Sequence, residues 1–135
     1  MRAYVLDASA LLRYLDRESG FERVATLLKQ AAREDVRLLV SAVNWGEVAS
    51  VLYNAHNASV ARETISKLRA LPLTITSVNA DQAEEAGSFK QDFKTPYADA
   101  FAGSLAFREK ATLVTADFDF KLASQSMRIE FLPNK

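Results

Sequence analysis

Apolar residues along this chain alternate between short clusters and longer segments with helical spacing. The short clusters are rich in β-branched and other apolar residues, which is typical of buried strands. We predict strands at residues 4–6, 38–40, 73–75 and 113–115, with a further strand at 128–132.

The longer segments between these clusters predict helices. In residues 21–32, apolar side chains recur at positions 21, 24, 25, 28 and 32, while charged side chains occupy the opposite face. This spacing places one apolar stripe along an amphipathic helix. Comparable patterns predict helices at residues 45–53, 60–71, 80–89 and 98–107, with a turn between helices at 94–97.

Strands that alternate with helices favour an α/β fold. We expect a mainly parallel central sheet of four to five strands flanked by helices, in a three-layer sandwich. Repeats, low-complexity tracts and linkers rich in glycine or proline are absent from the sequence, so we expect one domain over residues 1–135. Ligands of such sheets gather at the carboxyl ends of the strands, and we expect the chemistry there.

Composition narrows the possible chemistry. The chain has no cysteine and a single histidine, His56, to which we assign no role. Thiol nucleophiles and Cys/His zinc sites are therefore excluded, which leaves oxygen ligands. Seventeen basic residues balance 17 acidic ones, so any contact with nucleic acid must be local. The sequence shows neither a signal peptide nor a membrane-spanning run, and we expect a cytoplasmic protein.

Four carboxylates stand out by their positions. Asp7 and Asp117 each follow a predicted strand, so both should leave the sheet at one edge. Glu47 and Asp99 lie near the starts of two predicted helices among apolar or small residues. Because buried acids need a cation or hydrogen bonds, and hard divalent ions prefer carboxylate oxygen, we expect a Mg²⁺ or Mn²⁺ site.

Each acid also has a simpler interpretation, which the sequence leaves open. Asp7 is placed to cap the following helix, and the nearby Ser9 is open to the same interpretation. Asn44 and Glu47 have the spacing of a capping box, with Asn44 as the cap. Asp99 is placed to interact with a helix dipole.

Near the C-terminus, Asp117 and Asp119 also fit a polar turn after the strand. Four phenylalanines nearby are interpreted as core residues rather than surfaces for base stacking. These are Phe101, Phe107, Phe118 and Phe120.

Four segments together resemble the PIN domain family, and within it the VapC-type toxins of type II toxin–antitoxin pairs. They are residues 6–11, 41–47, 98–100 and 115–120, and the resemblance covers essentially the whole chain. It implies that the metal-binding and catalytic carboxylates are Asp7, Glu47, Asp99 and Asp117. Ser9 and Thr115 would support them as hydroxyls, with Asn44 and Asp119 completing the supporting set. Whether Asp117 or Asp119 is the fourth acid stays open.

The resemblance also implies an activity and partners. Members of the family usually act as Mg²⁺- or Mn²⁺-dependent endoribonucleases, often on structured RNA such as tRNA. They usually form homodimers and are covered by a cognate antitoxin protein. Local phosphate contacts are expected from basic residues, namely Arg13, Lys90, Lys94 and Arg108.

Other functions remain as alternatives. A non-catalytic metal-binding or antitoxin-binding module and a DNA-directed nuclease are compatible with the same residues. A phosphotransfer receiver or phosphatase is disfavoured, because the last strand is followed by Ala116 and Asp117 rather than a lysine, and Asp7 begins no Asp-x-Asp pattern.

Overall fold

The computed structural model describes residues 1–134, which contain a five-stranded sheet in the order β3-β2-β1-β4-β5. All neighbouring strands run parallel. This confirms the predicted α/β fold with a parallel central sheet. The strands are β1 (Arg2–Leu6), β2 (Val36–Ser41), β3 (Thr74–Thr76), β4 (Thr112–Thr115) and β5 (Ile129–Phe131).

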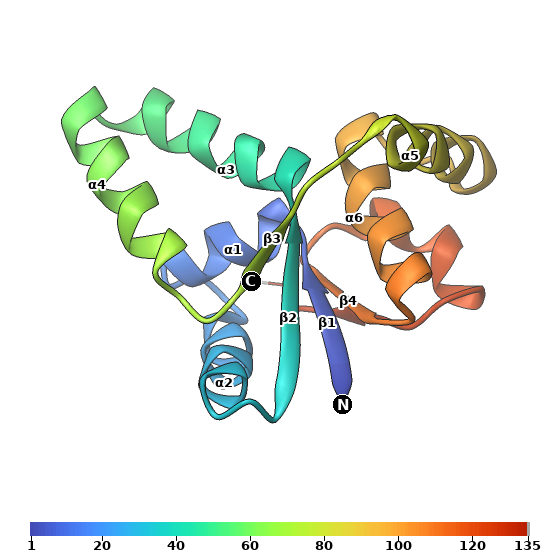
Figure 1. The fold of residues 1–135 in the computed structure, drawn as a ribbon, viewed down its shortest axis with the longest axis horizontal. Coiled ribbons are helices and arrows are strands. Elements are labelled where there is room, and N and C mark those ends of the chain that lie inside the picture. The colour runs from blue at the N-terminus through green and yellow to red at the C-terminus, as the bar shows by residue number, and fades with distance from the viewer. Residues whose placement is uncertain (135) are drawn as a thin grey trace.

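Helices cover both faces of this sheet and form the expected three layers (Figure 1). The first four helices pack on one face, and the last two pack on the other together with two short 3₁₀ turns that precede β5. The helices are α1 (Ala8–Leu15), α2 (Phe21–Ala32), α3 (Ala42–Ala55), α4 (Ala58–Arg69), α5 (Ala80–Phe93) and α6 (Tyr97–Glu109), and the turns are η1 (Phe118–Phe120) and η2 (Leu122–Gln125).

The central strand β1 shows why its sequence reads as a continuous apolar run. Tyr4 and Leu6 face the core beneath α1 to α4, whereas Ala3 and Val5 face the core beneath α5 and α6. Side chains of a strand alternate between its two faces, and here both faces are buried. An apolar residue is therefore needed at every position.

Helix α3 begins earlier than its apolar pattern predicts. It starts at Ala42, directly after β2, and the Ser41 hydroxyl caps it by accepting a hydrogen bond from the Val43 N–H at 3.3 Å. Asn44 therefore lies inside the first turn, and the interpretation of Asn44 and Glu47 as a capping box is wrong. The two side chains contact each other directly instead.

The interpretation of the four phenylalanines as core residues is half correct. Phe101 and Phe120 are buried, but Phe107 is 59% exposed and Phe118 is 51% exposed. Phe107 lies near the end of α6, and Phe118 opens the short turn η1, where only part of its ring is covered. The prediction was wrong for Phe107 and Phe118 because sequence periodicity fails at the ends of elements.

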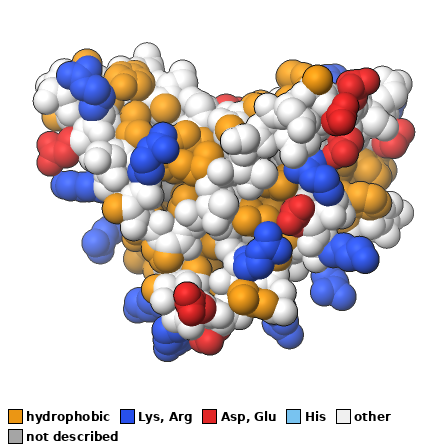
Figure 2. Space-filling view, viewed as in Figure 1, with side chains coloured by type: hydrophobic (Ala, Val, Ile, Leu, Met, Phe, Trp, Pro, Cys, Tyr) orange, Lys and Arg blue, Asp and Glu red, His pale blue; other side chains and the backbone are white. Residues whose placement is uncertain are grey.

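The strand order reverses beside β1, with β2 and β3 on one side and β4 and β5 on the other. The carboxyl ends of β1 and β4 thus form the switch point at which doubly wound sheets bind ligands. The molecular outline is hollowed at this edge, between the α3–α4 pair and the α5–α6 pair (Figures 1 and 2).

Membrane insertion of a helix finds no support in this fold. Across residues 1–134, no helix has both the length and the apolar character that crossing a bilayer requires.

Candidate metal centre

Asp7 is the most buried acid at the carboxyl edge, with 2% of its surface exposed. One oxygen accepts hydrogen bonds from the Ser9 hydroxyl at 2.7 Å and from the Ala10 N–H at 2.9 Å. The other accepts from the Thr115 hydroxyl at 2.5 Å. Asp7 is indeed the cap of α1, as its position after β1 suggested. Even with these donors, burial raises its pKa from 3.8 to about 6.

Two hydroxyls join Asp7 to the end of β4. The Ser9 hydroxyl lies 3.3 Å from that of Thr115 and accepts a hydrogen bond from the Ala116 N–H at 2.9 Å. The Thr115 hydroxyl in turn accepts from the Asp117 N–H at 2.9 Å. Ser9 and Thr115 therefore tie the backbone segment around Asp7 to the segment around Asp117, although the two acids are far apart in the sequence.

Glu47 reaches the same edge from α3 and is held by Asn44. The Asn44 side-chain amide donates to Glu47 Oε1 at 2.8 Å and to the Ala98 carbonyl at 3.1 Å. Because Ala98 lies in the first turn of α6, this one buried amide connects the starts of α3 and α6. Its own carbonyl oxygen, Oδ1, is buried and has no hydrogen-bond partner.

Asp99 lies in the first turn of α6 and is the acid most affected by the others. Its pKa is raised to about 8, first by burial, then by the adjacent Asp117 carboxylate, and further by the charges of Asp7 and Glu47. One of its oxygens, Oδ2, is buried without a hydrogen-bond partner. The three other predicted acids thus all lie close enough to raise the pKa of Asp99.

Asp117 and Asp119 occupy the turn that follows β4, as the simpler interpretation of these residues predicted. Asp117 accepts a hydrogen bond from the Asp119 N–H at 2.9 Å and thereby caps η1. Carboxylate oxygens of Asp99, Asp117 and Asp119 lie within 4.8 Å of one another, which is compatible with one shared cation. The Asp117 charge raises the pKa of the exposed Asp119.

The surroundings supply little positive charge from side chains. Within residues 1–134, no lysine or arginine forms a salt bridge with Asp7, Glu47, Asp99, Asp117 or Asp119. The first turns of α1, α3 and α6 meet here instead, and helix N-termini carry only partial positive charge. Burial is the main cause of the raised pKa values of Asp7 and Asp99, and repulsion by neighbouring carboxylates adds to it.

These observations fit a divalent metal ion. The buried polar side-chain atoms without a hydrogen-bond partner in residues 1–134 belong to Asn44, Thr95 and Asp99, which lie in the first turns of α3 and α6 or just before α6. Buried polar groups are nearly always satisfied, so an unpartnered carboxylate oxygen among other carboxylates indicates a place for a cation. Thr95 was missed from the sequence, because nothing in a Thr-Pro turn signals burial.

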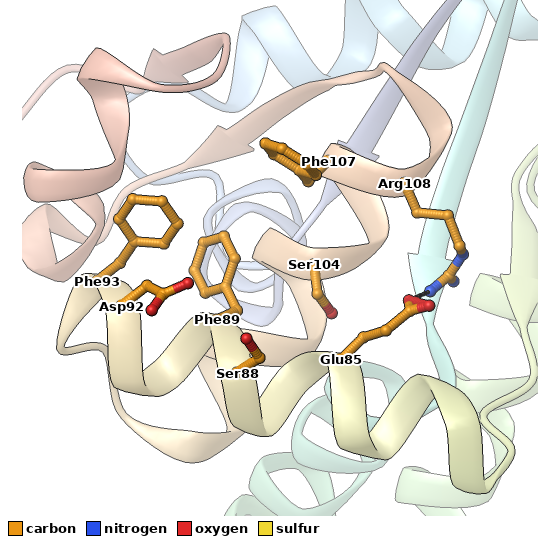
Figure 3. A pocket seen from close by; sticks show the side chains of 8 residues that line it. All are labelled: Glu85, Ser88, Phe89, Asp92, Phe93, Ser104, Phe107 and Arg108. Carbon is orange, nitrogen blue, oxygen red and sulfur yellow. Dashed lines mark hydrogen bonds and ion pairs between the residues drawn. The ribbon is translucent and has the colours of Figure 1, made fainter.

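The basic residues expected beside the acids are engaged elsewhere or exposed. Arg13 donates to the Ser19 and Pro133 carbonyls at 2.7 and 2.9 Å. Arg108 pairs with Glu85 at 2.6 Å at a pocket between α5 and α6 (Figure 3). This pocket is not lined by the acidic cluster, by which we mean Asp7, Glu47, Asp99, Asp117 and Asp119. Lys90 and Lys94 are exposed on α5 and at its end. A denser basic group, missed from the sequence, lines a pocket at the opposite edge of the sheet and comprises Arg2, Arg37, Lys110 and Arg128.

We compared the sequence with protein-family models and the fold with solved structures. The PIN domain family model matches residues 4–125. Among solved structures, VapBC2 from Rickettsia felis bound to a DNA fragment of its promoter has a TM-score of 0.75 at 16% sequence identity, with 97% of this chain and 99% of that chain covered. No curated protein sequence matches the chain significantly.

Two further structures have the same architecture. VapC20 from Mycobacterium tuberculosis, described as a toxin that cleaves the sarcin–ricin loop, has a TM-score of 0.67 at 16% identity over 96% of this chain and 99% of that chain. VapBC-5 from the same organism, a member of the VapBC family of toxin–antitoxin systems, has a TM-score of 0.62 at 14% identity over 99% and 100%. At such identities the likeness demonstrates a common fold.

Proposed function

This chain belongs to the PIN domain family, and on that premise we propose that it is a metal-dependent endoribonuclease and the toxin of a type II toxin–antitoxin pair. The observation that carries the proposal is that the charges of Asp7, Glu47 and Asp117 all act on Asp99, one oxygen of which is buried without a hydrogen-bond partner. No lysine or arginine of residues 1–134 neutralises these acids through a salt bridge. Such a set favours a hard divalent cation.

The ion would be Mg²⁺ or Mn²⁺, held by Asp7, Glu47, Asp99 and Asp117. An ionised carboxylate offers about four lone-pair sites. Three hydrogen bonds occupy three of these sites on Asp7, and the remaining one is on the oxygen that accepts from Thr115. Asp7 is therefore suited to bind through one oxygen only. Asp99 retains a free oxygen, and Asp119 is available as an additional or alternative acid.

When bound, the metal ion supplies charge neutralisation at the scissile phosphate and a lower pKa for water. The chain's residues orient the ligands: Ser9 and Thr115 fix Asp7, while Asn44 fixes Glu47. Glu47 or Asp99 would accept the proton of the attacking water. Because water is the nucleophile rather than the ribose 2′-hydroxyl, we expect products with 5′-phosphate and 3′-hydroxyl ends.

The partners follow from the same premise. We propose that residues 1–135 form a single nuclease domain that acts on RNA, with tRNA as the first substrate to test. We also propose that the protein forms a homodimer in the cytoplasm and that a cognate antitoxin inhibits it. The VapBC complexes with this fold support the antitoxin partner.

The proposal is tested by incubating purified protein with a total tRNA pool in Mg²⁺, Mn²⁺ or EDTA. We expect cleavage only with metal, and a loss of about 100-fold or more in the Asp7→Asn and Asp99→Asn variants. Asp81→Asn is the matched control, because Asp81 also lies in the first turn of a helix but is exposed. Its cleavage rate should equal that of the wild type.

Three outcomes would contradict the proposal. Products with 2′,3′-cyclic phosphate ends would exclude water as the nucleophile. Cleavage of single-stranded or duplex DNA but not RNA would indicate a DNA nuclease. Mg²⁺ binding that depends on Asp7 and Asp99, without cleavage of either nucleic acid, would indicate a non-catalytic module.

A further inference from the structure

Phe118 combines exposure with a position inside the acidic cluster. It lies between Asp117 and Asp119 in the chain, yet 51% of its surface is exposed. Its ring stacks on that of Phe131, with centroids 5.4 Å apart and planes inclined by 18°. One ring face is therefore held by the protein, and a large part of the ring remains open to solvent.

The backbone around this aromatic pair is held by Thr115 and Asp117, which also belong to the candidate metal centre. Phe131 lies opposite Thr115 in the pairing of β5 with β4, and the Thr115 hydroxyl donates a hydrogen bond to Asp7. The turn that carries Phe118 is closed by the hydrogen bond from the Asp119 N–H to Asp117. Phe118 is thus held at the carboxyl edge of the sheet, in a turn that also carries Asp117 and Asp119, two of the candidate metal ligands.

Single exposed apolar residues are common on proteins, so exposure alone indicates nothing. Phe107 illustrates this, because it is 59% exposed but lies at the α5–α6 pocket, which the acidic cluster does not line (Figure 3). What distinguishes Phe118 is a ring supported by Phe131, on a turn that also carries two acids of the proposed cleavage site. Aromatic rings in such positions stack on unpaired bases of single-stranded RNA.

We propose that Phe118 is a base-stacking platform that positions an unpaired nucleobase next to the scissile phosphate. This inference rests on the proposed ribonuclease function. A phenyl ring has no hydrogen-bonding group, so it would hold any base by its π-face. Phe118 would therefore select unpaired over duplex RNA without setting the base sequence.

The test uses a short single-stranded RNA that carries one 2-aminopurine, whose fluorescence is quenched on stacking, moved through successive positions. In EDTA, which prevents metal-dependent cleavage, wild-type protein should lower the fluorescence of the single strand but not that of the same strand in a duplex. Phe118→Leu should abolish this quenching and weaken RNA binding about fivefold or more. Phe118→Tyr should retain both properties, and Phe107→Leu, the matched control, should equal the wild type.

The Tyr variant also separates stacking from folding, since it preserves an aromatic ring on Phe131. Equal quenching of single-stranded and duplex RNA by wild type, or unchanged quenching with Phe118→Leu, would overturn the proposal. So would loss of a homodimer in Phe118→Leu by sedimentation, because the ring would then be a protein interface.

Cleavage assays in Mg²⁺ distinguish failure of this inference from failure of the proposed function. Phe118→Leu should raise KM more than it lowers kcat. If Phe118→Leu cleaves RNA with an unchanged KM, the stacking inference is refuted and the proposed nuclease function stands. Quenching that depends on Phe118, without cleavage by any form, would refute the nuclease function and leave the stacking site in place.

Discussion

Asp7 performs two tasks that conflict at neutral pH. It accepts three hydrogen bonds, one of which caps α1, and as a proposed metal ligand it must stay charged while only 2% of its surface is exposed. Burial raises its pKa from 3.8 to about 6. The folded protein therefore retains a proton between about pH 4 and 6 that the unfolded chain releases. Without metal, the ionisation of this side chain lowers the free energy of unfolding progressively across that interval, and the loss is constant at higher pH.

We predict that Asp7→Asn stabilises the metal-free protein at pH 8 by up to about 3 kcal/mol, the equivalent of its pKa shift. At pH 4, where the carboxyl is largely protonated in the folded state, the difference should be small. Urea denaturation in EDTA at both pH values measures this. A variant that is less stable than wild type at pH 8 would contradict the prediction, and Asp81→Asn serves as the control.

The roles of Asp117 and Asp119 can be separated by charge removal. Asp117 raises the pKa of both Asp7 and Asp99, whereas Asp119 is exposed and contributes to neither pKa shift. We therefore predict that Asp117→Asn weakens Mg²⁺ binding at least tenfold more than Asp119→Asn does, where tenfold corresponds to about 1.4 kcal/mol. Calorimetric titration with Mg²⁺ measures both affinities. The reverse order would make Asp119 the fourth ligand.

At the scale of elements, Asn44 joins two helices that come from opposite faces of the sheet. Its amide donates to Glu47 in α3 and to the Ala98 carbonyl in α6, and the residue is fully buried. Removing it takes a donor from Glu47 and from the part-buried Ala98 carbonyl, and an acceptor that loses its partner away from water costs more than the net value of a hydrogen bond.

Accordingly, Asn44→Ala should lower the free energy of unfolding by about 1–3 kcal/mol and weaken Mg²⁺ binding as well. Asn79→Ala is the matched control, because Asn79 caps α5, and its loss should cost about 1 kcal/mol without changing Mg²⁺ affinity. Urea denaturation and calorimetry measure the two effects. Equal Mg²⁺ affinities for Asn44→Ala and wild type would show that Asn44 has only a structural role.

Individual elements also show how far sequence reasoning extends. The short apolar run of β1 and the amphipathic pattern of α2 were sufficient to predict both elements, because burial imposes a period on the sequence. Phe118 and Phe120 have nearly the same neighbours, but the three-residue turn η1 leaves one 51% exposed and the other fully buried. No periodicity exists over so short a turn. The positions of Asp7 and Asp117 after two strands predicted that they would lie at one edge of the sheet. The contact of Asn44 with both α3 and α6 could not be predicted, because it depends on how the two helices pack.

For the whole molecule, the candidate centre lies where all three layers meet. Glu47 comes from a helix on one face of the sheet and Asp99 from a helix on the other, with Asp7 and Asp117 at strand ends between them. A cation bound by these acids would connect the two helical layers. Binding to the folded state alone stabilises it by about 2.7 kcal/mol at 100 times the dissociation constant.

We predict that Mg²⁺ slows amide hydrogen exchange in the first turns of both α3 and α6. Exchange in α4, which contributes none of the candidate ligands, should change only as much as global stability does. Hydrogen exchange followed by mass spectrometry, with and without Mg²⁺, measures this, and Asp99→Asn should abolish the effect. Protection confined to one of the two helices would mean that the ion does not join the layers.

The span of sequence between Asp7 and Asp117 has a consequence for synthesis of the protein. The two acids meet because β1, near the start of the chain, pairs with both β2 and β4. A nascent chain on the ribosome therefore lacks a complete acidic set until residues 117–119 have been translated. At about 5–20 residues per second, more than 100 intervening residues require roughly 5–20 seconds. The order of strands therefore makes assembly of the acidic set wait until the last of these segments has been synthesised.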